Sequence, residues 1–443
     1  MSISHTIRML LDIQDKNIIF EGDCIYEGTR KGHTCRYAEG TLTYVPTQCE
    51  NCVIENEHYT VIKNGTKIST IVLPNDGVKK TYLKLKKQRF QCRHCQSTFI
   101  AKTPLVDEGC FISKHTWAQA IIKSAEAKSL KDIARGCKIS TSSVQRGIDR
   151  ERKRLHTYNR KLPEHLSFDE FKYAKGTMAF IYTDAALGEI LDILPQRNGR
   201  TIREHFINFY PLKQRKKVKT VTIDMNASYV NIIKELFPHA DIIIDRFHIV
   251  QLMTRSMNKT RVNIMNGFNT SRGEDLKKYR RIKGYWRLLL KSSKDLSSTE
   301  YRYYRLFGQQ ASQTVVDTIL DYSPDLRANY QLYQQLLTAF NKKDYEYLEE
   351  ILNEKKDLNI SSYIRTSLKT LRKHLPYIKN SFAYPFNNGR IEGINNKIKV
   401  LNRVAYGYRN FYNYKYRILL HFKYKAVDPQ KKQEQNKTHA SAA

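Results

Sequence analysis

Four cysteines stand in two closely spaced pairs, a spacing that is typical of metal ligands. Cys49 and Cys52 form one Cys-x-x-Cys pair, and Cys92 and Cys95 form another. Two such pairs that converge in space supply the four thiolates of a tetrahedral structural zinc site. We predict a structural Zn²⁺ here; the alternative is that all four are buried or redox-idle thiols. The other cysteines are expected to be small buried side chains: Cys24, Cys35, Cys110 and Cys137.

Three acidic residues lie in segments that could bring carboxylates together. Asp169 lies in the strand-like run HLSFDEFKY, and Asp224 ends the strand-like run VKTVTIDMN, at the strand end where α/β sheets place ligands. Glu392 lies in NNGRIEGINNKIKVLNR, which predicts a helix after a glycine turn. Three carboxylates on two strands and a helix could hold two divalent cations for phosphoryl transfer. Taken singly, each acid equally fits an ordinary polar residue at a strand end or on a helix surface.

Cations follow Glu392 along one stripe of the last predicted helix. Asn396, Lys399 and Arg403 lie four, seven and eleven residues after it, so all four side chains share a face. A metal-binding acid with cations along the same helix face could bind the end of a DNA strand. The alternative is a solvated helix face with an ordinary ladder of polar contacts.

The charge balance indicates a polyanionic partner. Lys and Arg number 76 and Asp and Glu 43 among 443 residues, which gives a net charge of +33, while 41% of the residues are hydrophobic. This composition excludes a disordered basic tail and favours a folded protein that binds nucleic acid. An anionic membrane would call for an apolar anchor, and the sequence has no apolar run near the length of a membrane-spanning helix. We therefore expect a soluble, cytoplasmic protein that binds double-stranded DNA.

The segment SLKDIARGCKISTSSVQRGIDRERKRL, which begins at Ser129, predicts two helices joined by a turn. The turn runs through Gly136 and Ser140, and the second helix begins at about Thr141. This is the pattern of a helix-turn-helix, whose second helix enters the major groove by its N-terminal residues. A run of basic residues at 150–154 suits phosphates, whereas the alternative is an ordinary helical hairpin. The residues expected to be exposed for base or phosphate contacts are Ser142, Ser143, Gln145 and Arg146.

The order of the predicted elements indicates several domains. Short strand-like runs surround the paired cysteines, and a helical stretch follows. Between His165 and Asp245, strand-like runs alternate with helical ones, which predicts an α/β sheet. From Ile249 to about Lys379 the pattern is helical with almost no strand signal. The chain is thus expected to be a multidomain α/β protein.

In this order the motifs resemble those of DDE transposases of bacterial insertion sequences, specifically the ISL3 family. The resemblance covers nearly the whole chain and rests on these segments: LLDIQDKNIIF, CENC, CRHC, LKDIARGCKISTSSVQR, SFDEF, TIDMNASY, DRFHIVQL and NNGRIEGINNKIKVLNRVAYGYRN. Such proteins have a ribonuclease-H-like α/β catalytic core that an all-helical insertion interrupts before the final Glu. The resemblance therefore implies that Asp169, Asp224 and Glu392 are the catalytic triad and bind two Mg²⁺ ions, for which Mn²⁺ can substitute.

The resemblance also implies roles for several neighbours of the triad. Asp245 and His248 in DRFH match a pattern that some related transposases carry beside the second catalytic Asp, as support or as a DNA contact. Lys399 resembles a DNA-contacting Lys of other insertion-sequence enzymes, and Arg403 continues its stripe. Those enzymes often have an Arg four residues before the Glu. Asn388 occupies that position here, so Arg390 is expected to substitute.

The resemblance and the patterns together predict this division of the chain: a zinc-binding N-terminal module (1–105), a helix-turn-helix DNA-binding domain (106–160), the first part of the ribonuclease-H-like core (161–260), a helical insertion (261–380), the C-terminal core helix with the catalytic Glu (381–427) and a disordered tail (428–443).

The expected function is that of a transposase. It would bind the terminal inverted repeats of its insertion sequence, cleave the strand and transfer it to target DNA, as a homodimer or higher oligomer at the bacterial nucleoid. The alternatives are a transposase-derived DNA-binding regulator that no longer cuts and a structure-specific nuclease that shares the core.

Overall fold

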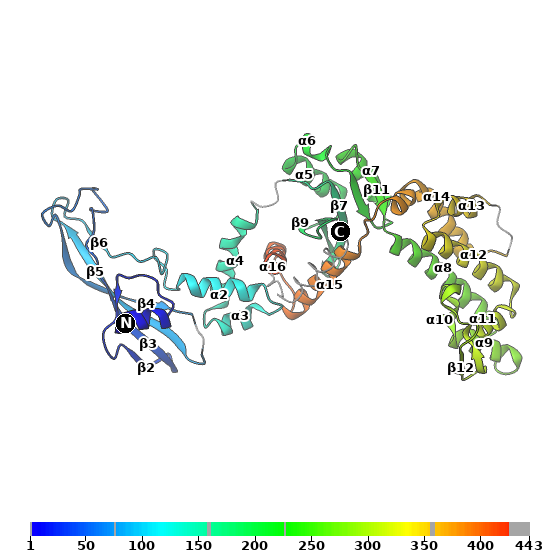
Figure 1. Cartoon of the computed structure of the whole chain (residues 1–443), viewed down its shortest axis with the longest axis horizontal. Coiled ribbons are helices and arrows are strands. Elements are labelled where there is room, and N and C mark those ends of the chain that lie inside the picture. The colour runs from blue at the N-terminus through cyan, green and yellow to red at the C-terminus, as the bar shows by residue number, and fades with distance from the viewer. Residues whose placement is uncertain (1, 75–76, 157–160, 226, 355–358, 425–443) are drawn as a thin grey trace. The chain divides into compact units, whose positions relative to one another are not determined.

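The chain folds into two compact units in the computed structural model (Figure 1). The structure describes residues 2–74, 77–156, 161–225, 227–354 and 359–424, so the predicted tail at 428–443 lies outside the described residues. One unit is made of Met1–Tyr158 together with Ile398–Ala443, and the other is made of Asn159–Lys397. Both ends of the chain therefore belong to the same unit.

A six-stranded sheet forms the N-terminal part of the first unit. Its strands follow helix α1 (Ile3–Leu10) and are β1 (Ile18–Ile19), β2 (Ile25–Arg30), β3 (His33–Leu42), β4 (Val61–Val72), β5 (Lys80–Cys92) and β6 (Thr98–Ile100). The order is β1-β3-β5-β4, with β2 paired to β3 and β6 paired to β5. In β5, Leu83 and Leu85 are fully buried, whereas Lys84 and Lys86 alternate with them on the other face.

The first unit also contains the helices α2 (Lys114–Ser124), α3 (Leu130–Gly136), α4 (Thr141–His156) and α16 (Phe411–Lys423), and the end of α15 (Gly389–Val404) from Ile398 onward. The side chain of Ser129 caps α3 by accepting a hydrogen bond from the backbone N–H of Asp132, as its position in the sequence predicts. Buried Ile133 and Val144 pack with Leu420 of α16 in one small core. The buried guanidinium of Arg417 donates to the backbone oxygens of Glu126 and Lys128, which fixes α16 against the α2–α3 turn.

A mixed five-stranded sheet forms the centre of the second unit. Its strands are β7 (His165–Ala174), β8 (Thr177–Asp184), β9 (Ile190–Leu194), β10 (Thr220–Ile223) and β11 (Asp241–Ile244), in the order β11-β10-β7-β8-β9. β7, β10 and β11 run parallel, and β8 and β9 are antiparallel to their neighbours. Three helices lie between these strands in the sequence: α5 (Gly199–Phe209) and α6 (Leu212–Arg215) before β10, and α7 (Ala227–Leu236) before β11. Stacked and edge-on rings of Phe168, Phe206 and Phe237 fill the core between sheet and helices.

A helical region separates this sheet from the last core helix. Its helices are α8 (Arg246–Gly267), α9 (Glu274–Gly284), α10 (Trp286–Leu289), the 3₁₀ turn η1 (Ser293–Asp295), α11 (Ser312–Leu320), α12 (Pro324–Lys342), α13 (Tyr345–Asn353) and α14 (Ser362–Ala383). α14 returns the chain to the sheet, because Asn380 and Ser381 donate hydrogen bonds to backbone oxygens of β11. α15 (Gly389–Val404) follows it.

The expectation that this insertion is all-helical is wrong at one point. β12 (Tyr301–Tyr304) and β13 (Gly308–Ala311) form an antiparallel hairpin. The alternating residues Tyr301 and Tyr303 suit a strand, and Gly308 provides the positive φ of 71° that the chain adopts as it enters β13. The hairpin is short, which explains why the surrounding helical pattern hides it.

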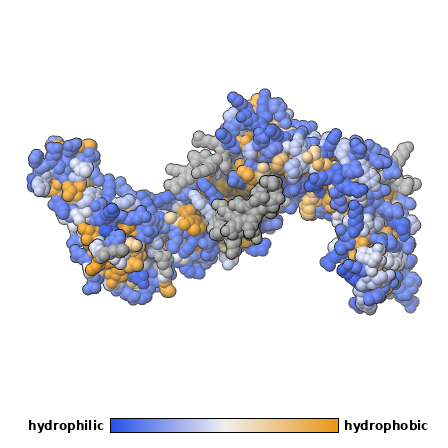
Figure 2. Space-filling model, viewed as in Figure 1, coloured by the Kyte–Doolittle hydropathy of each residue, from blue (hydrophilic) through white to orange (hydrophobic). Residues whose placement is uncertain are grey.

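Hydrophilic side chains cover most of the visible face of each unit (Figure 2). An apolar exception lies on α1, where Ile3, Met9 and Leu10 are 62%, 65% and 73% exposed. No helix in the described ranges is long and apolar enough to cross a membrane.

Gly147 of α4 provides a test of the helical packing. A Cβ at this position would lie 2.9 Å from two ring carbons of Trp117, closer than real Cβ contacts. We expect Gly147→Ala to lower the stability of the protein by about 1 kcal/mol, because overpacking outweighs the gain in helix propensity. Thermal unfolding followed by circular dichroism measures the change.

Gly136→Ala is the matched control. Its Cβ would meet only the flexible side chain of Lys123, at 3.5 Å or more. This variant is expected to melt at or slightly above the wild-type temperature. An equal loss of stability in both variants would show that the Gly147–Trp117 contact is not tight.

Candidate functional site

Two of the predicted acids lie on neighbouring parallel strands. β7 and β10 pair in the register Ser167 to Thr222. Asp169 and Asp224 each lie two residues further along, Asp169 within β7 and Asp224 directly after β10. Because the strands are parallel and adjacent, both side chains line the same pocket.

A histidine, His248, connects the third predicted acid, Glu392, to Asp224. Glu392 lies in the first turn of α15, and His248 lies in the first turn of α8. The Nε2 atom of His248 is 2.9 Å from Oδ1 of Asp224 and 3.3 Å from Oε1 of Glu392. One imidazole therefore joins the acid of β10 to the acid of α15.

Asp245 completes a tight group with these residues. It precedes α8, and its side chain is only 3% exposed. One ligand atom each of Asp245, His248 and Glu392 lies within 4.8 Å of the other two. Among the described residues no other group of acids and histidines is this compact, so Asp245 and His248 could share a metal ion with Glu392.

Two buried asparagines of the α15 segment hold the aspartates. Nδ2 of Asn388 donates to Oδ1 of Asp224 over 3.1 Å, and Nδ2 of Asn395 donates to Oδ2 of Asp169 over 2.7 Å. Asn388 is fully buried and Asn395 is 6% exposed. They lie four residues before and three residues after Glu392, hence on its side of the helix. One face of this segment therefore contacts both aspartates and supplies the glutamate.

Burial and mutual repulsion shift the titration of these groups. Burial, followed by the charge of nearby Asp224, raises the pKa of Asp169 to about 7. Burial also raises the pKa of Asp245 above its usual range. The hydrogen bond to Asp224 raises the pKa of His248. The raised pKa values of Asp169, Asp245 and His248 thus reflect carboxylates held close together in a partly buried place.

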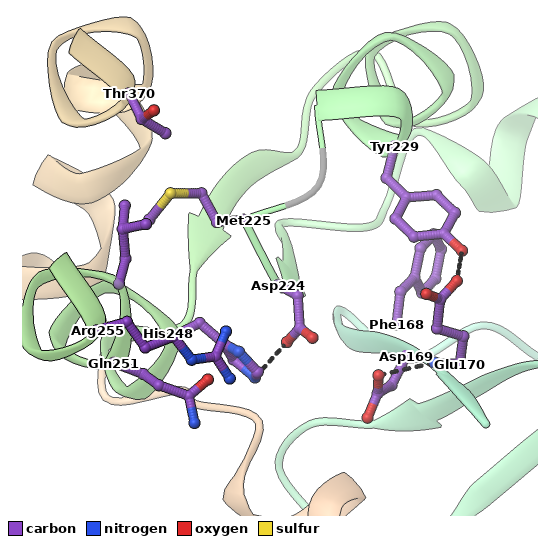
Figure 3. Close-up of a pocket in the computed structure, with 11 residues that line it drawn as sticks. Phe168, Asp169, Glu170, Asp224, Met225, Tyr229, His248, Gln251, Arg255 and Thr370 are labelled. Carbon is purple, nitrogen blue, oxygen red and sulfur yellow. Dashed lines mark hydrogen bonds and ion pairs between the residues drawn. The ribbon is translucent and has the colours of Figure 1, made fainter. Parts of the chain in front are cut away.

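Asp169 and Asp224 border a cavity of about 410 Å³. Figure 3 shows Asp169 and Asp224 around it, with His248 reaching Asp224 from α8. Gln251 and Arg255 of α8 and Thr370 of α14 also line it. On the sheet side, the hydroxyl of Tyr229 donates to Glu170, which also forms an ion pair with Arg197. The cavity thus has carboxylates on one side and polar and cationic side chains of α8 on another.

The donor set fits divalent cations. Hard cations such as Mg²⁺ prefer carboxylate and amide oxygens. Three buried oxygens around the acids have no hydrogen-bond partner: Oδ2 of Asp245, Oδ1 of Asn388 and Oδ1 of Asn395. A bound cation would satisfy these buried oxygens, because each is an acceptor without a partner beside closely spaced carboxylates.

The four paired cysteines converge, as their spacing predicts. Sγ of Cys49 lies 3.7 Å from Sγ of Cys95, and Sγ of Cys52 lies 3.8 Å from Sγ of Cys92. Four thiolates at about 2.3 Å from a tetrahedral zinc are about 3.8 Å from one another. All four ligand atoms lie within 4.8 Å of one another, so this group could hold a zinc ion.

The remaining cysteines are outside this cluster. The expected burial of Cys24, Cys35 and Cys137 is confirmed. It is wrong for Cys110, which is half-buried and accepts a hydrogen bond from Arg150.

The predicted DNA-contacting residues of α4 differ in exposure. Ser142 and Arg146 are exposed, and Gln145 is half-buried with its amide donating to Asp149. The expected exposure of Ser143 is wrong, because Ser143 is only 4% exposed. Ser143 lies on the inner face of α4 next to Val144, and its hydroxyl hydrogen-bonds with that of Ser140.

The basic run at 150–154 follows these residues in α4. The side chains of residues 153 and 154 in this run lie outside the described residues.

The predicted DNA-contacting cations of α15 differ in their surroundings. Arg390 donates to the backbone oxygen of Ala186, and its side chain packs over Gly188 in the β8–β9 turn. It therefore contacts this turn in the structure. Lys399 and Arg403 are exposed in the second half of α15.

Sequence reasoning missed several residues of the cavity. Asn395 was not singled out, although its spacing from Glu392 places it on the same helix face. Gln251 and Arg255 were missed too; their signal is that they lie three and seven residues after His248. Glu170 follows Asp169 directly, and its contact with Tyr229 has no signal in the sequence.

Comparison with known proteins identifies the family of the chain. A family model for DDE transposases of the ISL3 type, described as a transposase, matches residues 166–418, more than half of the chain. The chain therefore belongs to the ISL3 family of DDE transposases, and the resemblance is confirmed. Membership implies an enzyme of the nuclease or transferase kind that acts on DNA.

Two relatives illustrate the range of similarity. The chain is 28% identical over 300 residues to the transposase for insertion sequence element IS1001 of Bordetella parapertussis, a match that covers 66% of this chain and 70% of that protein. It is 45% identical over 122 residues to a Lactococcus lactis protein named as an ATP-dependent protease. The latter match covers 27% of this chain and only 39% of that protein.

The crowding of acids predicts an unusual effect of removing one. In metal-free protein at mildly alkaline pH, we expect Asp169→Asn to raise stability by about 1 to 3 kcal/mol, because it removes a buried charge next to Asp224. The carboxamide oxygen can still accept from the backbone N–H of Glu170, and Asn395, whose Oδ1 has no partner, can turn its amide to accept from the new NH2 group. Thermal unfolding in the presence of EDTA measures the effect.

Glu350→Gln on α13 is the control, because Glu350 is exposed in the same unit. Its melting temperature should match that of the wild type. If Asp169→Asn melts lower than both, the repulsion inferred here is absent.

Proposed function

We propose that this transposase binds the terminal inverted repeats of its insertion sequence, cleaves a phosphodiester at the element end and joins the freed 3′ end to target DNA. The observation that supports the proposal most strongly is that Asp169 and Asp224 line one cavity with His248, while His248 also contacts Glu392. The mixed sheet that carries two of these acids corresponds to the proposed ribonuclease-H-like core. The helical region between Asp224 and Glu392 corresponds to the proposed insertion.

In this proposal Asp169, Asp224 and Glu392 hold two Mg²⁺ ions, and Mn²⁺ can substitute. When bound, such ions lower the pKa of the attacking water or hydroxyl and neutralise the charge that develops on the phosphate oxygens. Asn388 and Asn395 orient the two aspartates through their amide N–H groups. Nε2 of His248 donates to Asp224 and lies within ion-pair distance of Glu392, so this imidazole keeps the two carboxylates close together.

Arg255 and Gln251 line the other side of the cavity, where a phosphodiester would enter. A guanidinium pairs well with phosphate oxygens, so Arg255 is proposed to hold the strand next to the acids. Arg390, Lys399 and Arg403 are proposed as further DNA contacts along α15. Asp245 is proposed to support Glu392 and His248, with which it forms a compact group.

The first unit is proposed to recognise the element ends. α3 and α4 form the proposed helix-turn-helix, with Ser142, Gln145 and Arg146 at the N-terminal part of the second helix. Ser143 is proposed to position Arg146, whose guanidinium donates to its hydroxyl. Zinc at Cys49, Cys52, Cys92 and Cys95 is proposed to hold the sheet module together. Synapsis of two element ends requires at least a dimer on DNA.

The alternative of a binding-only regulator is less well supported, because the cluster of acids is complete. The protease name of the Lactococcus relative is not proposed for this chain, since that match covers a minor part of either protein.

Loss of one acid should abolish cleavage. We expect Asp224→Asn to reduce Mg²⁺-dependent cleavage of an element-end duplex at least about 100-fold, because a charged ligand is lost where phosphate charge develops. Gel analysis of end-labelled DNA measures the products, and strand-joined products distinguish a transposase from a structure-specific nuclease.

Glu350→Gln serves as the control and should cleave as the wild type does. DNA binding by Asp224→Asn should persist, which shows that the variant is folded. Equal cleavage by wild type and Asp224→Asn would refute the proposed active site.

Zinc content provides a separate test. The purified wild-type chain should contain one zinc per protein, and Cys92→Ser should lose most of it, because three thiolates bind less tightly and Cys92 is fully buried in the cluster. Atomic absorption measures the metal. Cys110→Ser, which changes a half-buried cysteine outside the cluster, should retain the zinc. Zinc loss in both variants, or in neither, would count against this site.

A further inference from the structure

A short loop after α15 presents a tyrosine to solvent in a fixed conformation. The ring of Tyr406 is 93% exposed, and its backbone has a positive φ of 58°, which is rare for a bulky residue. Gly407 follows with a φ of 88°. Backbone N–H groups of Tyr406 and Gly407 donate to Arg403 and Asn402, so the loop closes directly on the end of the helix. These bonds and the left-handed residue form a common type of helix end, which fixes the backbone that carries the Tyr406 side chain.

The other end of the loop is anchored as firmly. The ring of Tyr408 stacks on Tyr414, with 4.6 Å between centroids, and Tyr414 is 1% exposed. Oδ1 of Asn410 accepts from the backbone N–H groups of Tyr412 and Asn413 and thereby caps α16. The loop Ala405–Asn410 is therefore held at both ends, and Tyr406 is at its tip.

This loop borders a cavity of about 420 Å³ within the first unit. The opposite walls are the start of α3, with Ser129 and Lys131, and the start of α4, with Thr141 and Gln145. The cavity thus lies next to the turn of α4 that is proposed to read DNA. A volume of this size is in the range that holds a small molecule or a single nucleotide.

The lining suits the parts of a nucleotide. Tyr406 offers a ring face, and Gln145 and Asn413 offer carboxamides, which can hydrogen-bond base edges. Lys131 and Arg409 offer positive charge for a phosphate. None of the described residues that line the cavity is acidic.

We propose that the loop Ala405–Asn410 and the first turns of α3 and α4 form a pocket for one unpaired DNA nucleotide, whose base stacks on Tyr406. Bases inside an intact duplex cannot present a face to this ring, since they are stacked on their neighbours. An unpaired nucleotide beside a duplex held by α4 can do so. The inference rests on the proposed function, because unpaired nucleotides arise at an element end when its two strands are cut at staggered positions.

Binding to two forms of the same element end tests the proposal. One labelled duplex is blunt, and the other has a single-stranded extension of a few nucleotides. The full-length wild type should bind the extended duplex about 5-fold or more tightly, as expected for one stacked base. Tyr406→Ala should lose this preference and keep its affinity for the blunt duplex. Fluorescence anisotropy measures both affinities.

Tyr412→Ala is the matched control, because Tyr412 is also a surface tyrosine, 48% exposed on α16, and does not line the cavity. It should keep the preference for the extended duplex. The proposal is overturned if the wild type binds both duplexes equally, if Tyr406→Ala weakens both to the same extent, or if Tyr412→Ala has the same effect as Tyr406→Ala.

The two proposals fail in different ways. A preference for the extended duplex that depends on Tyr406, without any Mg²⁺-dependent cleavage, would refute the proposed function and leave the pocket. Cleavage that depends on Asp224, without any preference for unpaired DNA, would refute the pocket and leave the proposed function.

Discussion

The arrangement of the second unit depends on holding several carboxylates close together in a half-buried place. Like charges at this spacing repel, and burial removes the water that would screen them. The chain offsets this with donors from elements far apart in sequence: His248 from α8, and Asn388 and Asn395 from the α15 segment. The sheet sets the spacing of Asp169 and Asp224, and α14 returns the chain to β11 before α15 begins.

The acids and His248 could be predicted from the sequence, whereas the asparagine contacts that hold the aspartates could not. Asp224 directly follows a buried strand, and Glu392 lies in a recognisable motif. The spacing of Asn395 puts it on the same helix face as Glu392, but an asparagine in a basic helix suits the surface equally well. Its contact with Asp169 depends on how α15 packs against β7, a distance of more than two hundred residues along the chain. Sequence patterns carry no information on such packing.

The first unit shows the same division. The spacing of Cys49, Cys52, Cys92 and Cys95 predicts their convergence, because that spacing is itself the constraint. The order of the strands around them was not predictable, because β3 pairs directly with β5 in parallel although β4 lies between them in the sequence. Ser143 was misplaced because serine has no clear preference for either face of a helix, and only the neighbouring Val144 and Ile148 indicate the inner side.

The contribution of α16 to the core of α2, α3 and α4 has a consequence for synthesis. Buried Tyr416, Arg417 and Leu420 contact elements that leave the ribosome more than 250 residues earlier. Since chains fold from the N-terminus as they are made, the helices around Ile133 must wait, with part of their apolar surface uncovered, until α16 has been made. A message that ends before α16 would therefore yield a polypeptide whose first unit lacks part of its core, even if the second unit were complete.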